Sequence, residues 1–170
     1  MLQKPDKSEY AEFQHKYIKD VPEDVLPYLQ SQKQALANYL SQYDEDDLSL
    51  TYEKGKWSIR EVVAHIIDTE IIFDYRALCT SRNEKQVLPG FDQDEYVEPR
   101  YMDHMTKNYL EKYFSATRDQ SLVLFDGFTK AQWAQVGNMS SYTMTLRSFP
   151  YMLAGHFDHH MKILKERYTF

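Results

Sequence analysis

The chain has 170 residues and a formal net charge of −6, with 20 Lys and Arg residues scattered among 26 Asp and Glu residues. Because the basic residues form no stripe, nucleic acid is not an expected partner. No apolar run approaches the roughly 20 residues of a membrane span, and the first residues lack the apolar core of a signal peptide. The one cysteine excludes an intrachain disulfide. We therefore expect a cytoplasmic protein outside the membrane.

The first part of the chain is predicted to be an arm followed by a helix. Residues 1–21 are polar with aromatic residues between them, a pattern that fits an N-terminal arm lying on a single domain, residues 1–170. After Pro22, apolar residues recur at helical intervals and predict a first helix that ends near Tyr43. The acidic run at 44–47 is predicted to be a solvated connection.

A second helix has a well-marked start. Ser58 and Glu61 have the spacing of a capping box, and the apolar pattern that follows predicts a helix to about Ser81. This start places His65 about two turns into the helix, alone among apolar residues. Asp68 borders the face of His65 and is a candidate for accepting its ring proton or for acting as a general base; the alternative is a solvated acid.

The next segment, 83–105, interrupts the helical pattern with Pro89, Gly90 and Pro99. Long ordered loops in small domains often cover sites, so we expect this loop to lie over one. Asp92 and Tyr96 are its candidates for reaching that site, although most acids on loops simply face water.

The last part of the chain is predicted to contain two more helices. Apolar periodicity indicates one from about Met105 to Phe128 and another from about Leu146 to between Leu164 and Tyr168. A short helical turn after Thr129 and a hairpin-like or irregular loop over 137–145 connect them. Gly155 removes a side chain where another element is expected to pack closely.

The stretch 155–164, GHFDHHMKIL, carries half of the six histidines. His156 and His160 are four residues apart, so on a helix both imidazoles lie on one face and can converge on one ion, with His65 as the third ligand. Three histidines suit Zn²⁺ or a similar divalent ion and leave a coordination position open, as in catalytic sites. Alternatively, His65 is a hydrogen-bonded core residue and the pair lies on a solvated face. His159 could replace His160 in the pair or orient a ligand.

Taken together, these motifs resemble a known family. The segments GKWSIREVVAHIIDTE, FDYRAL, LPGFDQDEYV and AGHFDHHMKILKERY resemble the DinB/YfiT-like superfamily in order and spacing over about residues 20–168. The resemblance implies an all-α four-helix bundle of up-down-down-up connectivity, often a homodimer. It also implies one divalent metal, Zn or Ni, bound by His65, His156 and His160, with His159 as a neighbour.

Three hypotheses about function are considered. The first is a metal-dependent enzyme that activates water or a low-molecular-weight thiol such as bacillithiol, acting on a small-molecule substrate as a hydrolase or thiol S-transferase. Asp68 or Asp92 would accept a proton in that reaction. The second is a non-catalytic bundle that binds a metal or a small ligand, and a third, purely structural role would place the histidines in hydrogen bonds in the core.

Overall fold

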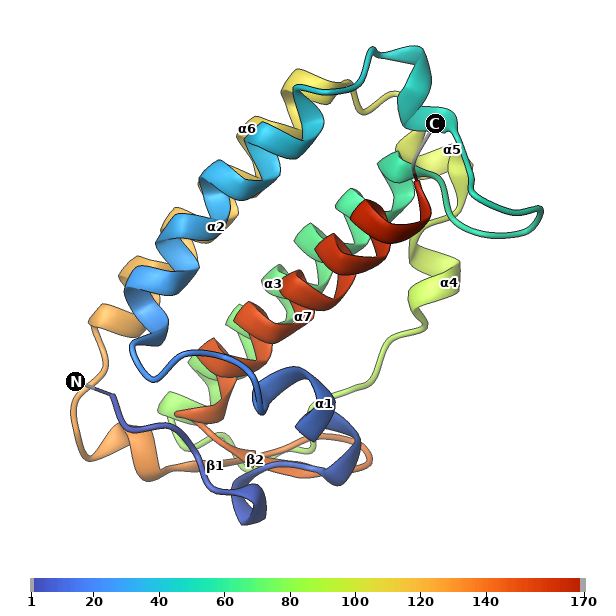
Figure 1. The fold of residues 1–170 in the computed structure, drawn as a ribbon. Helices are drawn as coiled ribbons and strands as arrows, with labels where there is room; N and C mark the ends of the chain where they lie inside the picture. Colours follow the sequence, from blue (N-terminus) through green and yellow to red (C-terminus); the bar gives the residue numbers. More distant parts are fainter. Residues whose placement is uncertain (1, 169–170) are drawn as a thin grey trace.

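Four long helices form the body of the molecule, as the computed structural model shows for residues 2–168, with the backbone alone described at residues 99 and 100. They are α2 (Val25–Leu40), α3 (Ile59–Ser81), α6 (Lys107–Asp126) and α7 (Ser148–Arg167). In Figure 1, α2 and α7 run in one direction and α3 and α6 in the other. The predicted all-α four-helix bundle with up-down-down-up connectivity is therefore confirmed.

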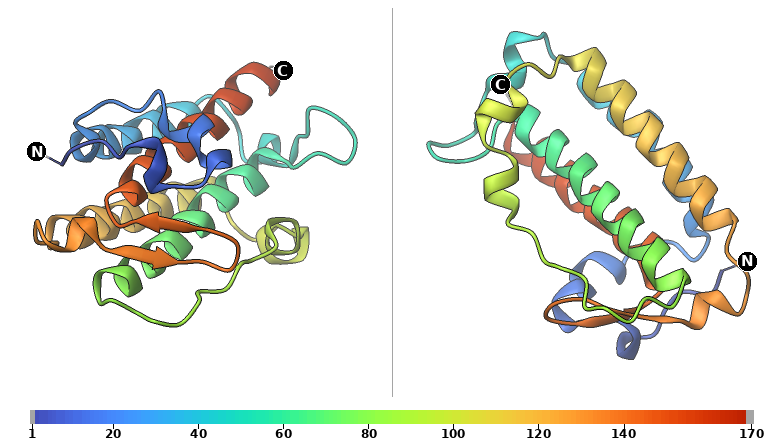
Figure 2. Two further views of the ribbon diagram at one scale, coloured as in Figure 1. Left: turned by 90° about the horizontal axis from the view of Figure 1, so that it is seen from below. Right: turned by 180° about the vertical axis from the view of Figure 1, so that it is seen from behind.

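The remaining elements are short. They are α1 (His15–Ile18), α4 (Gln93–Tyr96), α5 (Pro99–Met102), the strands β1 (Val136–Asn138) and β2 (Thr143–Thr145), and the 3₁₀ turns η1 (Lys7–Glu9), η2 (Glu12–Gln14), η3 (Asp46–Ser49) and η4 (Gln132–Ala134). The strands form an antiparallel hairpin where a hairpin-like or irregular loop was expected. Figure 2 shows this hairpin and the N-terminal arm together at the end of the bundle where α3 ends and α7 begins. Within residues 2–168, no helix is both long and apolar enough to span a membrane.

The start of α3 follows the predicted capping box. Ser58 donates its backbone N–H to Glu61 Oε2 over 2.6 Å, and its hydroxyl accepts the backbone N–H of Glu61 over 3.3 Å. Both contacts satisfy backbone groups that a helix start otherwise leaves without partners. The cap fixes where α3 begins and therefore how far along the bundle His65 lies.

The core consists of two apolar clusters with a polar layer between them. On α2, Gln32 separates Leu29 of one cluster from Leu36 of the other. On α3, Glu70 lies between Ile67 and Phe73, which belong to different clusters in the same way. The polar layer therefore crosses the bundle near the middle of its helices.

Arg118 on α6 is the centre of this layer and is fully buried. Its guanidinium donates to both carboxylate oxygens of Glu70, over 2.6 and 2.8 Å, to Gln32 Oε1 over 2.6 Å and to the Leu29 carbonyl over 2.8 Å. A buried charge is tolerated only when it is paired and hydrogen-bonded in this way. The layer thus ties α2, α3 and α6 together.

Asp74 extends the layer, and its surroundings favour the protonated form of its carboxyl group. The hydroxyl of Ser121 lies 2.7 Å from Glu70 Oε1 and 2.9 Å from Asp74 Oδ2, but it has one hydrogen to donate. In its protonated form, Asp74 would resolve this by donating to the Ser121 oxygen. Burial, and to a smaller extent the nearby charge of Glu70, raises the pKa of Asp74 to about 7 against the opposing hydrogen bond from Ser121.

Asp74→Asn is therefore expected to stabilise the protein at alkaline pH, because the amide keeps the hydrogen bond to Ser121 and never ionises. The raised pKa means that folding favours neutral Asp74, so wild-type stability falls as pH rises from 3.8, the ordinary pKa, through about 7. Relative to wild type, the variant should gain about 2–3 kcal/mol in unfolding free energy between pH 5 and pH 8. Urea unfolding across this range measures the gain. Asp126→Asn, at an exposed position at the end of α6, is the control, and equal pH dependence in wild type and Asp74→Asn would contradict the assignment.

The N-terminal arm is fastened to the bundle at several points. The carboxylate of Glu9 accepts hydrogen bonds from the Arg147 guanidinium, one of them over 2.6 Å, and from the Thr145 hydroxyl over 2.9 Å. The Tyr151 hydroxyl donates to the Glu23 carbonyl over 2.7 Å and lies 3.1 Å from the Leu2 carbonyl oxygen. These contacts hold the arm against the hairpin and the start of α7.

Gly155 is where the arm comes closest to α7. A β-carbon built there would lie 1.9 Å from the carbonyl oxygen of Tyr17, at the end of the arm. This backbone contact confirms the expectation of close packing beside His156.

Gly155→Ala should destabilise the protein by about 1–3 kcal/mol, the usual cost of overpacking, because the opposing atom belongs to the backbone and can move only if α1 moves. Chemical denaturation measures the loss, and hydrogen exchange should show lower protection of residues 15–18. Gly127→Ala is the matched control, since its β-carbon would lie an ordinary 3.5 Å from the nearest atoms. Equal effects of the two substitutions would rule out the close approach as the cause.

Candidate metal centre

Three histidines from two antiparallel helices meet in the interior. His65 extends from α3, and His156 and His160 extend from adjacent turns of α7. The Nε2 atom of His156 lies 3.1 Å from Nε2 of His65 and 3.1 Å from Nε2 of His160. One ligand atom from each residue lies within 4.8 Å of the others, so the geometry that an ion requires exists.

The donor set fits a divalent transition metal better than it fits hydrogen bonding among the rings. His156 Nε2 faces two other ring nitrogens and has either one hydrogen or one lone pair, so it cannot make two good hydrogen bonds. Around a tetrahedral ion with metal–nitrogen distances of about 2.0–2.1 Å, neighbouring ligand nitrogens lie about 3.3 Å apart. The observed separations are close to that value.

The histidines are neutral near pH 7, as metal ligands must be. Burial, and secondarily the charge of His159, lowers the pKa of His65 to about 4. Burial followed by the charge of His65 lowers the pKa of His160 to about 3, and the pKa of His156 falls well below its ordinary value for the same kinds of reason. Each ring therefore offers a lone pair at neutral pH.

Aromatic rings form two walls of the cluster. The Trp57 ring lies 4.9 Å from the His65 ring, measured between centroids. On the other side, the Tyr17 ring lies 5.8 Å from His156 and 5.2 Å from His159. His159 is itself outside the ligand group and has its ring 5.1 Å from that of His160.

A cavity of about 290 Å³ reaches the cluster at His160. Its other lining residues include Tyr52, Trp57, Asp94 and Tyr168. Since Asp94 belongs to α4, the loop between α3 and α6 does border this cavity. The site therefore has an opening for a small molecule next to one of its three imidazoles.

The acids proposed from the sequence lie in different places. Asp68 lines a second cavity, of about 580 Å³, together with Glu95 and Tyr96 of α4, and burial raises its pKa to about 6. In the described part of the chain no hydrogen bond joins Asp68 to His65. Asp92 caps α4 by accepting the backbone N–H groups of Asp94 and Glu95, over 2.9 and 3.3 Å. A catalytic role for either acid stays a prediction.

The residues that surround the cluster could not be predicted from the sequence pattern. Trp57 directly precedes the capping box, and Tyr17 is one of several aromatic residues of the arm. Neither position has a spacing that relates it to His65 or His156. The close packing expected at Gly155 was the one available signal, since it required a nearby element without identifying α1.

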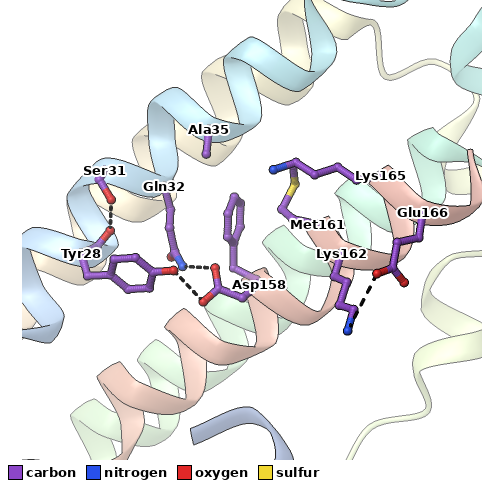
Figure 3. Close-up of a pocket in the computed structure, with 10 residues that line it drawn as sticks. Tyr28, Ser31, Gln32, Ala35, Asp158, Met161, Lys162, Lys165 and Glu166 are labelled. Carbon is purple, nitrogen blue, oxygen red and sulfur yellow. Dashed lines mark hydrogen bonds and ion pairs between the residues drawn. The ribbon is translucent and has the colours of Figure 1, made fainter. Parts of the chain in front are cut away.

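The opposite face of α7 borders a separate cavity of about 380 Å³ against α2. As Figure 3 shows, Asp158 accepts hydrogen bonds there from the Tyr28 hydroxyl and from Gln32 Nε2, each over 2.9 Å. Successive residues turn by about 100° around a helix, so Asp158 lies about 200° from His156. This cavity is therefore not part of the histidine cluster.

The chain belongs to the DinB superfamily, whose family model matches residues 28–164. This range covers most of the bundle and includes His65, His156 and His160. The family resemblance seen in the sequence is thereby confirmed.

Individual relatives agree with this placement. The chain is 29% identical to a protein of Oceanobacillus iheyensis named "putative metal-dependent hydrolase" over 80 residues. These residues make up 47% of this chain and 46% of the relative, so the match spans about half of that relative. Among solved structures, YfiT from Bacillus subtilis superposes with a TM-score of 0.72 at 18% identity, over 96% of this chain and 90% of that one. YfiT is described as a "probable metal-dependent hydrolase with an unusual four-helix bundle topology". A mycothiol-dependent maleylpyruvate isomerase gives a TM-score of 0.69 at 14% identity, over 85% of this chain and 61% of that one. These structures share the fold.

Proposed function

We propose that this protein is a metal-dependent enzyme in which His65, His156 and His160 hold one Zn²⁺ or Ni²⁺ ion. The observation that carries the proposal is the convergence of three neutral imidazoles, with ligand atoms within 4.8 Å of one another, beside an open cavity. The names of the Oceanobacillus iheyensis relative and of YfiT support a metal-dependent activity.

The reaction would be attack by water or by a low-molecular-weight thiol on a small molecule. When bound, the ion would lower the pKa of a coordinated water or thiol and so supply a nucleophile near neutral pH. The Trp57 ring packs against His65 and the Tyr17 ring against His156, so both rings border the reacting position. Asp68, whose pKa burial raises to about 6, or Asp92, which caps α4, would accept the proton.

Hydrolysis and thiol transfer differ only in the nucleophile. The shared fold with a mycothiol-dependent isomerase favours screening thiols, including bacillithiol, alongside water. The second candidate is a bundle that binds a metal or a small ligand without catalysis, which the same cluster and cavity would also serve.

The test compares untagged protein before and after metal removal by a chelator. Each state is assayed for ester hydrolysis, for amide hydrolysis and for the conjugation of electrophiles with thiols. The assays are repeated after one equivalent of Zn²⁺ or Ni²⁺ is restored. The proposal predicts turnover that disappears with the metal and returns with it. Stoichiometric metal without turnover of any substrate class would favour the binding protein.

A further inference from the structure

The N-terminal arm contains a basic pocket outside the histidine cluster. A cavity of about 670 Å³ is lined by Lys7, Tyr10, Glu12, His15, Lys16 and Lys19. It has three ammonium groups and one carboxylate, within a chain whose net charge is −6. This local excess of positive charge favours an anion.

The ammonium groups of the pocket are available to a ligand. All three lysines are exposed, and in the described part of the chain neither Lys7 nor Lys16 forms an ion pair. Lys19 Nζ lies 3.8 Å from a carboxylate oxygen of Asp20, but both side chains are solvated, so this pair is weak. The protein therefore neutralises only part of this positive charge.

Lys16 lies on the side of the pocket that faces the candidate metal centre. Its Nζ atom lies 4.7 Å from the centroid of the Tyr17 ring, the same ring that packs against His156 and His159. The backbone of Tyr17 is held against Gly155, and Glu9 anchors the preceding turn to Arg147. The lysine thus lies on a fixed element, one aromatic ring away from the imidazoles.

We propose that this pocket binds the anionic group, a carboxylate or a phosphate, of a small molecule whose reacting end lies at the histidine cluster. The anion would belong either to the substrate or to an acid-bearing thiol. The position of the reacting end rests on the proposed function. Anion binding by the pocket does not, since it needs neither metal nor turnover.

The first experiment measures binding of succinate, with the uncharged succinamide as its comparison, by calorimetry or NMR titration of the full chain. Titrations use the protein both as purified and after chelation, so that a carboxylate bound to a metal is recognised. Lys16→Glu is expected to weaken succinate binding by about tenfold or more, since it removes one charge-assisted contact and adds a repulsive charge. Lys16→Arg should retain binding.

Lys112→Glu is the charge-matched control, because Lys112 is an exposed residue of α6 outside the pocket, and its effect should stay within about twofold. Circular dichroism and the thermal midpoint establish that each variant is folded. Three outcomes would each overturn the proposal. They are equal affinity for succinate and succinamide, equal effects of Lys16→Glu and Lys112→Glu, and binding that requires the metal.

A second experiment identifies the source of the anion. The metal-loaded enzyme is given an acid-bearing electrophile with 2-mercaptoethanol, and then an uncharged electrophile with mercaptosuccinate. Lys16→Glu should raise KM for the acid-bearing partner alone and change kcat little. A KM increase in the first pairing assigns the pocket to the substrate and one in the second assigns it to the thiol, whereas unchanged KM in both overturns the link to the cluster.

Discussion

His156→Ala is expected to lower the affinity for Zn²⁺ by more than about a hundredfold. Changing a residue that only orients a metal ligand typically lowers metal affinity by about ten- to hundredfold, and His156 is assigned as a ligand itself. His156 is the central member of the cluster, because its Nε2 lies 3.1 Å from the Nε2 atoms of both other rings. Without it, His65 and His160 remain as an incomplete pair. Competition with a fluorescent chelator measures the affinity.

His159→Ala is the matched control for this loss. His159 lies on the same helix and contacts the same Tyr17 ring, but it is outside the ligand group. Its replacement should change Zn²⁺ affinity by no more than a few-fold. If the two variants lose affinity equally, His159 takes part in ligation and the assigned set of three is wrong.

Arg118→Met should cost about 3–5 kcal/mol of unfolding free energy, which would be the largest effect of a single substitution on stability. The replacement leaves Glu70, which is 2% exposed, as a buried charge without its partner, and it removes the donor to Gln32 and to the Leu29 carbonyl. Urea unfolding monitored by circular dichroism provides the measurement.

Two further variants separate this effect from the loss of any ion pair. Lys33 and Asp119 also join helices, over 2.6 Å, but their side chains are 21% and 56% exposed, so Lys33→Met should cost less than about 1 kcal/mol. Changing Glu70 to Met together with Arg118→Met should recover much of the loss, because no unpaired charge remains. Similar costs for Lys33→Met and Arg118→Met would show that the buried layer has no special role.

The long helices were predictable because their signals are local. Apolar periodicity located all of them, and the Ser58–Glu61 capping box fixed the start of α3 at the residue where the structure begins it. The short helices α4 and α5 were missed, since about one turn each, within a segment marked by Pro89 and Gly90, leaves no periodic pattern. The polar layer around Arg118 was also missed, because its members come from three helices, α2, α3 and α6, and no spacing relates them.

The candidate ligands were predictable for a similar reason. A four-residue spacing on one helix brings His156 and His160 together, and the structure brings His65 to them as the family resemblance implied. Their surroundings depend on tertiary contacts, so the contributions of Tyr17, Lys16 and Asp94 could not be read from spacing. Dimer formation and a cytoplasmic location stay predictions from the sequence.

The most direct test of the central claim is the metal content of untagged protein, measured by elemental mass spectrometry beside the His156→Ala/His160→Ala variant. A metal centre made by His65, His156 and His160 predicts about one Zn or Ni per chain in the wild type and almost none in the variant. Wild-type protein that is free of metal and also fails to take up added Zn²⁺ or Ni²⁺ would contradict the account.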